Sequence, residues 1–394
     1  MVQRKQYLGK LKKLKDKKII KVVTGIRRCG KSTLLLMFQE YLKECGVEDN
    51  QIITINFEDI ANEPLLDYRK LHDHVTKNLH QDKMAYVFLD EIQNVPQFQK
   101  AVDSLFIKDN VDVYITGSNA QLLSGELATL LSGRYIEIAM LPLSFAEYYE
   151  MVGGNQRDAW NNYFKNGGFP YAAVIEEEEI RREYLMGIYN SVLLKNVVAR
   201  KRISDIPLLE SVIKFLFDNI GSIVSSKKIA DSLTTYGRKT TSVTVENYIE
   251  ALTEAFILYK AGRYDVKGKQ YLKSLEKYYL VDVGLRRMLL GDRSADLGHI
   301  LENIVYLELL RRGNKVSIGK IDNNEIDFVA EFGGDRVYYQ VAASILDPAT
   351  FEREIAPLKK IADHYPKFIL SLDELPMGDA GIKQVNIVDF LLGN

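Results

Sequence analysis

The residues best suited to chemistry form the run from Gly25 to Ser32, GIRRCGKS, which has the spacing GxxxxGK[ST]. Glycines at both ends of such a loop let the backbone wrap around an anion, with its N–H groups pointing at phosphate. Lys31 would reach the β and γ phosphates of ATP, and the Ser32 hydroxyl would bind the Mg²⁺ that bridges them. The expected nucleotide-binding residues are therefore Gly25, Ile26, Arg27, Arg28, Cys29, Gly30, Lys31, Ser32 and Thr33.

Two carboxylates, Asp90 and Glu91, follow the apolar run AYVFL at residues 85–89. A short run of this kind is typical of a buried parallel strand, and ligands bind at the carboxyl ends of such strands. At that edge Asp90 would hold Mg²⁺ through its water shell, and Glu91 would polarise the attacking water. Together with the loop, this acidic pair predicts ATP hydrolysis, with Lys31 and Glu91 as catalytic groups.

Three further polar residues fit roles in phosphoryl transfer. Ser118 and Asn119 follow the buried run VDVYIT at residues 111–116, where either side chain would sense the γ phosphate and orient the water. Both equally suit a turn or a helix N-cap. Arg134 lies just ahead of the run YIEIA at residues 135–139. It would either reach the nucleotide of a neighbouring subunit and stabilise charge on the transferring phosphoryl group, or form an ordinary salt bridge.

The surrounding pattern predicts the elements that position these groups. The β-branched run at residues 19–23 leads into the loop, and a leucine-rich helical pattern continues to about residue 44. A strand at residues 51–57 and a short helix at residues 120–131 continue an alternation typical of a parallel α/β sheet. Residues 1–17 combine apolar side chains at helical spacing with a lysine-rich face. We expect this helix to pack beside the nucleotide site rather than to contact nucleic acid or membrane.

The motifs GIRRCGKS, VFLDEIQ, TGSN, and LSGRY followed by LPLSFAEY together resemble those of the AAA-type P-loop ATPases of the prokaryotic "archaeal ATPase" group. The resemblance extends from about residue 17 to the C-terminus. It implies an α/β fold with a parallel sheet ordered 5-1-4-3-2, and ATP and Mg²⁺ at the carboxyl ends of the strands. It also implies a helical lid and a C-terminal restriction-endonuclease-like domain of unknown function. The expected domains are 1–140, the ATPase core with its N-terminal helix; 141–204, the lid; 205–291, a winged helix-turn-helix; and 292–394, a degenerate restriction-endonuclease-like domain.

Three predicted helices followed by two strands indicate the winged helix-turn-helix. Arg238 and Lys239 precede the third helix, whose first residues, 241–247, would meet base edges of DNA while the basic groups bind phosphate. Winged helices also serve as protein–protein modules, so DNA and a protein partner both stay open.

An acidic set in the last segment carries the resemblance to nucleases. Such sites use an acidic residue, an aspartate and an [E/Q]xK triple to hold a divalent metal and activate water. Glu302, Asp327 and Gln340 fit these positions, but the triple reads QVA and its lysine is missing. Without the ammonium group the site should bind metal weakly and cleave poorly, so a degenerate nuclease fold used for binding is expected. An active nuclease would need a lysine from elsewhere, such as Lys320, Lys359 or Lys360.

Composition limits the other classes of function. An apolar content of 46%, a charged content of 27% and a net charge of −1 are typical of a globular protein with no global attraction to nucleic acid. Cys29 and Cys45 cannot build a disulfide framework. Cys29 would be either a thiol with its pKa lowered by a helix N-terminus or a small filler. There is no signal-peptide pattern and no apolar run of about 20 residues, so we expect a cytoplasmic protein without a membrane partner.

Together these patterns predict a Mg²⁺-dependent ATPase that couples its nucleotide state to a DNA- or partner-binding C-terminal half. ATP is the expected partner, and DNA and a second copy of the chain stay open as others. Two alternatives also stay open. One is an ATP-regulated, metal-dependent nuclease, and the other is a nucleotide-switched binding protein with negligible turnover.

Overall fold

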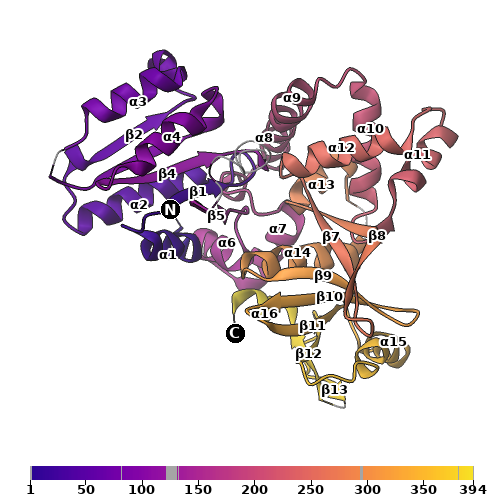
Figure 1. Ribbon diagram of the computed structural model, residues 1–394. Helices are drawn as coiled ribbons and strands as arrows, with labels where there is room; N and C mark the ends of the chain where they lie inside the picture. The colour runs from indigo at the N-terminus through magenta and orange to yellow at the C-terminus, as the bar shows by residue number, and fades with distance from the viewer. Residues whose placement is uncertain are drawn as a thin grey trace. The chain divides into compact units, whose positions relative to one another are not determined.

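The computed structural model describes residues 2–80, 82–120, 131, 133–292, 296–379 and 381–393 (Figure 1). The chain divides into two compact units. The first comprises Met1–Pro142 with Glu254–Phe256, and the second comprises Leu143–Thr253 with Ile257–Asn394. Most of the helix predicted over residues 120–131 lies outside the described residues.

Within the described residues, the first unit contains a five-stranded parallel sheet in the order β2-β3-β4-β1-β5. Its strands are β1 (Ile20–Thr24), β2 (Ile52–Asn56), β3 (Ala85–Asp90), β4 (Val111–Gly117) and β5 (Tyr135–Ala139). This order confirms the predicted 5-1-4-3-2 sheet, counted from the opposite edge. Every residue of β1, β3 and β4 is buried, because helices cover both faces, and this explains why the central strands are mostly apolar.

Helices pack on both faces of this sheet. They are α1 (Lys5–Leu14), α2 (Lys31–Glu44), α3 (Tyr68–Lys77) and α4 (Phe98–Ile107), with short 3-10 turns at Asp49–Gln51, Ile60–Leu66 and Ile92–Asn94. On one face Phe38 of α2 packs against Phe88 and Tyr114. On the other, α3 and α4 close an aliphatic core that includes Leu71 and Val102. The alternation along β3 and β4 therefore divides the core between two helical layers.

The middle of this sheet contains a buried ion pair. Lys21 of β1 and Asp112 of β4 are 0% and 3% exposed, and Nζ of Lys21 contacts Oδ1 of Asp112. The carboxylate also accepts hydrogen bonds from the Tyr114 hydroxyl (2.7 Å) and the Asp16 N–H (3.0 Å). Burial of such a pair is tolerated because each charge has several polar partners.

The second unit begins with helices. They are α6 (Phe145–Val152), α7 (Gln156–Asn166), the short 3-10 turn Ala172–Val174, α8 (Glu178–Ser191), a π-helical segment (Val192–Val198), α9 (Ala199–Lys201), α10 (Ile206–Asp218), α11 (Ser226–Thr235), α12 (Ser242–Glu254) and α13 (Val283–Leu290). Later helices are α14 (Leu297–Arg311), α15 (Pro348–Lys359) and α16 (Ile387–Leu392). Ser144 and Glu147 form a reciprocal cap at the start of α6, and the Ser225 side chain caps α11 by accepting a hydrogen bond from the Lys228 N–H.

Across the described residues, the second unit also has a nine-stranded mixed sheet in the order β13-β14-β12-β11-β10-β9-β7-β8-β6. The strands are β6 (Ile223–Val224), β7 (Leu258–Asp265), β8 (Gln270–Leu280), β9 (Lys315–Ile321), β10 (Asn324–Phe332), β11 (Asp335–Val341), β12 (Lys367–Ser371), β13 (Gly378–Asp379) and β14 (Ile382–Asn386). Because β7 pairs in parallel with β9, this sheet runs across the predicted boundary at residue 292. The predicted wing strands and the predicted C-terminal domain therefore share one sheet, and the separate domain limits stay predictions.

Candidate functional site

The phosphate-loop sequence adopts a sharply turned backbone between β1 and α2. Gly25 has φ +150° and Gly30 has φ +105°, values that L side chains rarely adopt. A Cβ on Gly25 would lie 2.2 Å from the Met140 carbonyl oxygen. Both glycines are therefore required by the backbone, and α2 begins directly after the loop with its first-turn N–H groups available to an anion.

The Lys31 ammonium group joins the loop to the tip of β3. Its Nζ donates to the carbonyl oxygens of Gly25 (3.1 Å) and Ile26 (3.3 Å), and it lies 3.3 Å from Oε1 of Glu91. Burial alone would raise the pKa of Glu91, but the charge of Lys31, with hydrogen bonds from Gln93 and Ser118, holds that pKa below its ordinary value. Glu91 is therefore ionised at neutral pH, as a group that accepts a hydrogen bond from water must be.

Thr116 of β4 connects the two acidic residues. Its hydroxyl donates to Oδ1 of Asp90 (2.5 Å) and accepts a hydrogen bond from the Glu91 N–H (2.9 Å). Glu91 itself has φ +54°, a left-handed conformation that is costly for a residue with a side chain. Sequence reasoning missed Thr116. The available signal was a hydroxyl residue at the carboxyl end of the strand that neighbours β3.

Of the two proposed sensor residues, Ser118 contacts Glu91: its hydroxyl donates to Oε2 at 2.9 Å. Asn119 is buried beside it, with 1% of its surface exposed. The amide of Gln93 also donates to Oε2 of Glu91, a contact that the sequence did not indicate. The Ser118 hydroxyl and the Gln93 amide thus fix the orientation of the Glu91 carboxylate, and with it the position in which this group would hold a water molecule.

The donor set fits Mg²⁺ with ATP. Ser32 lies in the first turn of α2 with its side chain exposed, Thr33 follows it, and Asp90 is 4% exposed at the facing strand end. Within the described residues there is no group of three or more His, Cys, Asp or Glu side chains that could hold a metal by themselves. Mg²⁺ is commonly held by one carboxylate together with phosphate oxygens and waters, so Ser32 and Asp90 would be enough protein ligands for an ion that binds together with ATP.

Arg134 lies at the other edge of the sheet. Its carbonyl oxygen accepts a hydrogen bond from the N–H of Ile20, the first residue of β1, whereas the phosphate loop follows the last residue of that strand. Its guanidinium group pairs with Asp103 of α4. The structure therefore does not bring Arg134 to the nucleotide site of its own chain. Of the two roles expected for Arg134, the salt bridge is the one present within the chain.

The N-terminal segment supplies a residue that sequence reasoning missed. Helix α1 buries Tyr7, Leu8 and Leu11 as predicted for an amphipathic helix. Ahead of it, the buried Arg4 donates to the carbonyl oxygens of Cys29 (3.0 Å) and Leu141 (2.6 Å). Burial raises the pKa of the Cys29 thiol, so the thiol is a small filler of the loop and not an activated nucleophile.

The acidic residues expected in the C-terminal segment are close together. Glu302 on α14, Asp327 on β10 and Gln340 on β11 form one cluster, in which the Asp327 N–H donates to Oε1 of Gln340 (2.8 Å). The Gln340 amide donates in turn to Glu354 (2.9 Å). Burial and the charge of Glu302 raise the pKa of Asp327 well above its ordinary value.

The lysine of this cluster comes from β8, which the sequence did not indicate. Nζ of Lys277 lies 2.9 Å from Oε1 of Glu302 and 2.7 Å from Oε1 of Glu325. Burial acts to lower the pKa of Lys277, but the surrounding carboxylates raise it overall, so the ammonium group stays charged. Among the lysines suggested as substitutes, Lys359 pairs with Asp379 and Lys360 donates to Asn324.

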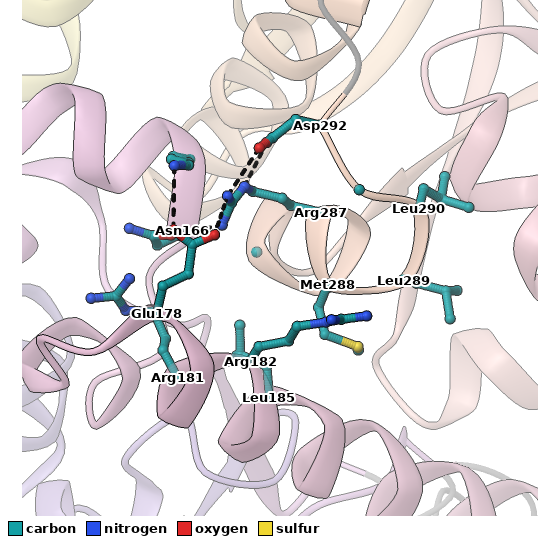
Figure 2. A pocket seen from close by; sticks show the side chains of 13 residues that line it. Asn166, Glu178, Arg181, Arg182, Leu185, Arg287, Met288, Leu289, Leu290 and Asp292 are labelled. Carbon is teal, nitrogen blue, oxygen red and sulfur yellow. Dashed lines mark hydrogen bonds and ion pairs between the residues drawn. The ribbon is translucent and has the colours of Figure 1, made fainter.

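A further polar cavity of about 440 Å³ lies between α7, α8 and α13 of the second unit. Figure 2 shows Arg287 donating to Asp292 and Glu178, and its contact with Asn166 is 3.4 Å. Arg181, also in the lining, donates to the carbonyl oxygens of residues 172 and 176. The bonds of Arg287 connect α7, α8 and α13, which is a structural role.

The region ahead of α12 is exposed and basic. Arg238 and Lys239 are exposed, and the neighbouring Tyr236 is 82% exposed. The Thr241 hydroxyl caps α12 by accepting a hydrogen bond from the Thr244 N–H at 3.1 Å. Charged and aromatic side chains thus stand together at the start of the predicted recognition helix.

Comparison with known proteins places these features in context. Residues 17–149 match the AAA domain family, and residues 157–296 match a domain of unknown function, DUF8612. An uncharacterized protein of Haemophilus influenzae is 40% identical over 400 residues, covering 100% of this chain and 99% of that protein. The uncharacterized protein MJ1544 of Methanocaldococcus jannaschii is 30% identical over 94% of this chain and 85% of its own length.

Among solved structures, the Walker-type ATPase PABY2304 of Pyrococcus abyssi aligns with a TM-score of 0.52 and 15% identity. The alignment covers 73% of this chain and 96% of that protein, which shows a shared fold. Among the residues that the structure describes, each helix is too short or too polar to cross a membrane.

Proposed function

This chain belongs to the family of AAA-domain proteins that includes these uncharacterized relatives, and from that premise we propose that it is a Mg²⁺-dependent ATPase. The observation that carries the proposal is the contact between Nζ of Lys31 and Oε1 of Glu91 at 3.3 Å. This contact supports the proposal because the phosphate loop and the acidic tip of β3 are then close enough to share one phosphate–metal cluster.

Each residue has a role that follows from its position. Lys31 would bind the β and γ phosphates, and Ser32 and Asp90 would hold Mg²⁺, whose contribution when bound would be to neutralise charge on the phosphate oxygens. Once Lys31 engages phosphate, its pairing with Glu91 weakens, and the glutamate accepts a hydrogen bond from the attacking water. Ser118 and Gln93 keep the carboxylate pointed at that water, because both contact Oε2. The nucleotide-sensing role of Asn119 rests on its buried position beside Ser118.

The proposal is tested by Glu91→Gln. This variant keeps the size of the side chain but cannot act as a base, so ATP binding should persist while steady-state phosphate release falls at least about a hundredfold. Normal hydrolysis by the variant would remove Glu91 from the mechanism. A wild-type protein that binds ATP tightly but turns it over negligibly, with or without DNA, would instead support the nucleotide-switched binding protein.

The C-terminal half is the recognition module in this proposal. The exposed group Tyr236, Arg238 and Lys239 at the start of α12 supports DNA as the partner, since basic and aromatic side chains contact phosphate and bases. Replacing Arg238 and Lys239 by alanine should weaken DNA binding and reduce its salt dependence. Equal binding by the double variant would favour a protein partner.

The proposal includes self-association, in which Arg134 of one copy of the chain acts at the nucleotide site of another copy. This arginine lies away from its own nucleotide site, so it acts only if a second copy of the chain receives it. An arginine supplied in trans can raise the rate of phosphoryl transfer by about a thousandfold or more.

A second candidate function, a metal-dependent nuclease, is favoured by one observation: Lys277 supplies the ammonium group that the QVA triple lacks. The hydrogen bonds of Gln340 oppose it, because its side-chain amide is already occupied by the Asp327 N–H and by Glu354, which reduces its capacity to bind metal. DNA cleavage with Mg²⁺ or Mn²⁺ that disappears in both Asp327→Ala and Lys277→Met would establish this activity. Cleavage that survives both changes would arise elsewhere.

A further inference from the structure

The side chain of Arg4 bridges two parts of the first unit that are far apart in sequence. Nη1 donates to the carbonyl oxygen of Cys29 in the phosphate loop at 3.0 Å. Nη2 donates to the carbonyl oxygen of Leu141 at 2.6 Å, one residue before the chain leaves this unit at Pro142. Arg4 is 3% exposed and lies over the Tyr7 ring at 5.0 Å, so its position is fixed by packing.

The exit segment, Met140–Pro142, is bound to the loop by more than Arg4. The Met140 N–H donates to the carbonyl oxygen of Thr24 at 2.7 Å, and the Met140 carbonyl oxygen packs directly on Gly25. The Leu141 N–H donates to the Tyr7 hydroxyl at 3.2 Å. Both sides of the Leu141 backbone are therefore held by residues of the N-terminal segment.

The contact with Cys29 has a consequence for phosphate binding. In a trans peptide the carbonyl group and the next N–H point in opposite directions. By holding the Cys29 carbonyl group on one side, Arg4 directs the Gly30 N–H to the other side. An N–H group that already points toward an anion need not reorient when the anion binds.

We propose that Arg4 is a positioning residue that holds the phosphate loop in its nucleotide-binding conformation and connects the loop to the exit segment. Nucleotide that orders the loop then also orders the exit segment. The nucleotide part of this inference rests on the proposed ATPase function. Arginine suits the role because its planar group offers two donors at fixed separation, whereas the ammonium group of lysine is a single point.

The test compares Arg4→Met and Arg4→Lys with Lys10→Met, which removes an exposed cation from α1, the helix that follows Arg4. Amide hydrogen exchange of the full chain is measured over residues 25–30 and 140–146 without nucleotide. In both Arg4 variants the two segments should exchange together, faster by about tenfold, as expected for loss of a charge-assisted hydrogen bond. The control should match wild type. Tyr7→Phe, which removes only the hydroxyl bound by Leu141, should speed the exit segment and leave the loop unchanged.

A second arm adds Mg²⁺ and the non-hydrolysable analogue AMP-PNP. Wild type and Lys10→Met should gain protection in both segments, whereas Arg4→Lys should gain it in the loop but lose most of it at the exit. Equal protection of the exit segment in Arg4→Lys and wild type would overturn the coupling. If hydrogen exchange of the exit segment without nucleotide is the same in both Arg4 variants as in wild type, Arg4 does not hold the exit segment. Failure of wild type to bind AMP-PNP would refute the ATPase proposal, and with it the effect of nucleotide on the exit segment. The experiment without nucleotide would still decide whether Arg4 connects the loop to the exit segment.

Discussion

Thr116→Val isolates the contribution of the hydroxyl that joins the two acidic residues. Valine has the shape of threonine, so the change removes the donor to Asp90 and the acceptor for the Glu91 N–H without opening a cavity. The site is fully buried, with 0% of Thr116 exposed, so water cannot replace either bond.

The structure sets the size of the effect. A hydrogen bond to a charged group contributes about 1.5–3 kcal/mol, and one between neutral groups about 0.5–1.5 kcal/mol. The two bonds of Thr116 together therefore account for about 2–4.5 kcal/mol of the free energy of unfolding. For catalysis, loss of a residue that orients a metal ligand typically reduces activity by about 10- to 100-fold.

The assay is steady-state ATP hydrolysis together with urea unfolding, with Thr116→Ser as the matched control. The serine variant keeps the hydroxyl group and should retain most of the activity. Thr116→Val should lower kcat far more than it weakens nucleotide binding, because the loop and Lys31 are untouched. A valine variant that is destabilised but hydrolyses ATP at the wild-type rate would show that the hydroxyl serves folding alone.

Three other predictions follow from charged groups. Asp112→Asn leaves the Lys21 ammonium group buried without its counter-charge, so the free energy of unfolding measured in urea should fall by about 3–5 kcal/mol. Replacing both residues by methionine or leucine should recover most of that loss. Equal stability of the single and double variants would contradict this. Burial raises the pKa of Asp282 to about 7, so the folded state holds a proton that the unfolded state has lost, and stability should fall as pH rises from about 4 to 7. Thermal unfolding across that range should show a shallower slope in Asp282→Asn, and an unchanged slope would assign the proton to another group. Arg134→Ala should leave ATP binding intact but lower the rate of ATP hydrolysis in a self-associated form of the protein. Mixing this variant with Lys31→Ala subunits should restore part of the hydrolysis rate. A rate equal to that of wild type would leave Arg134 with only its salt bridge to α4.

The parts of the fold that were predicted from sequence are those encoded locally. The loop glycines, the apolar runs of β3 and β4 and the leucine pattern of α2 each lie within one short stretch, and together they predicted a parallel α/β sheet. The order of its strands was implied by the resemblance to AAA-type ATPases. The meeting of Lys31 with Glu91 followed from a general rule about strand ends.

The residues that were missed act through contacts between distant segments. Arg4 reaches a carbonyl group 137 residues away, and Lys277 reaches Glu302 across 25 residues. An isolated arginine in a lysine-rich segment, or a lysine within a strand, is indistinguishable by pattern from a surface residue. The pairing of β7 with β9 was missed for the same reason, since strand partners are not encoded in either strand alone.

The central claim is that one phosphate–metal cluster lies between the loop and the tip of β3. Calorimetric titration of ATP in the presence of Mg²⁺ tests it most directly, with wild type compared with Lys31→Ala. We expect one site per chain in wild type, tighter with Mg²⁺ than with a chelator, and binding lost in the variant. Titrations that are the same for both proteins would place the nucleotide elsewhere and contradict the account.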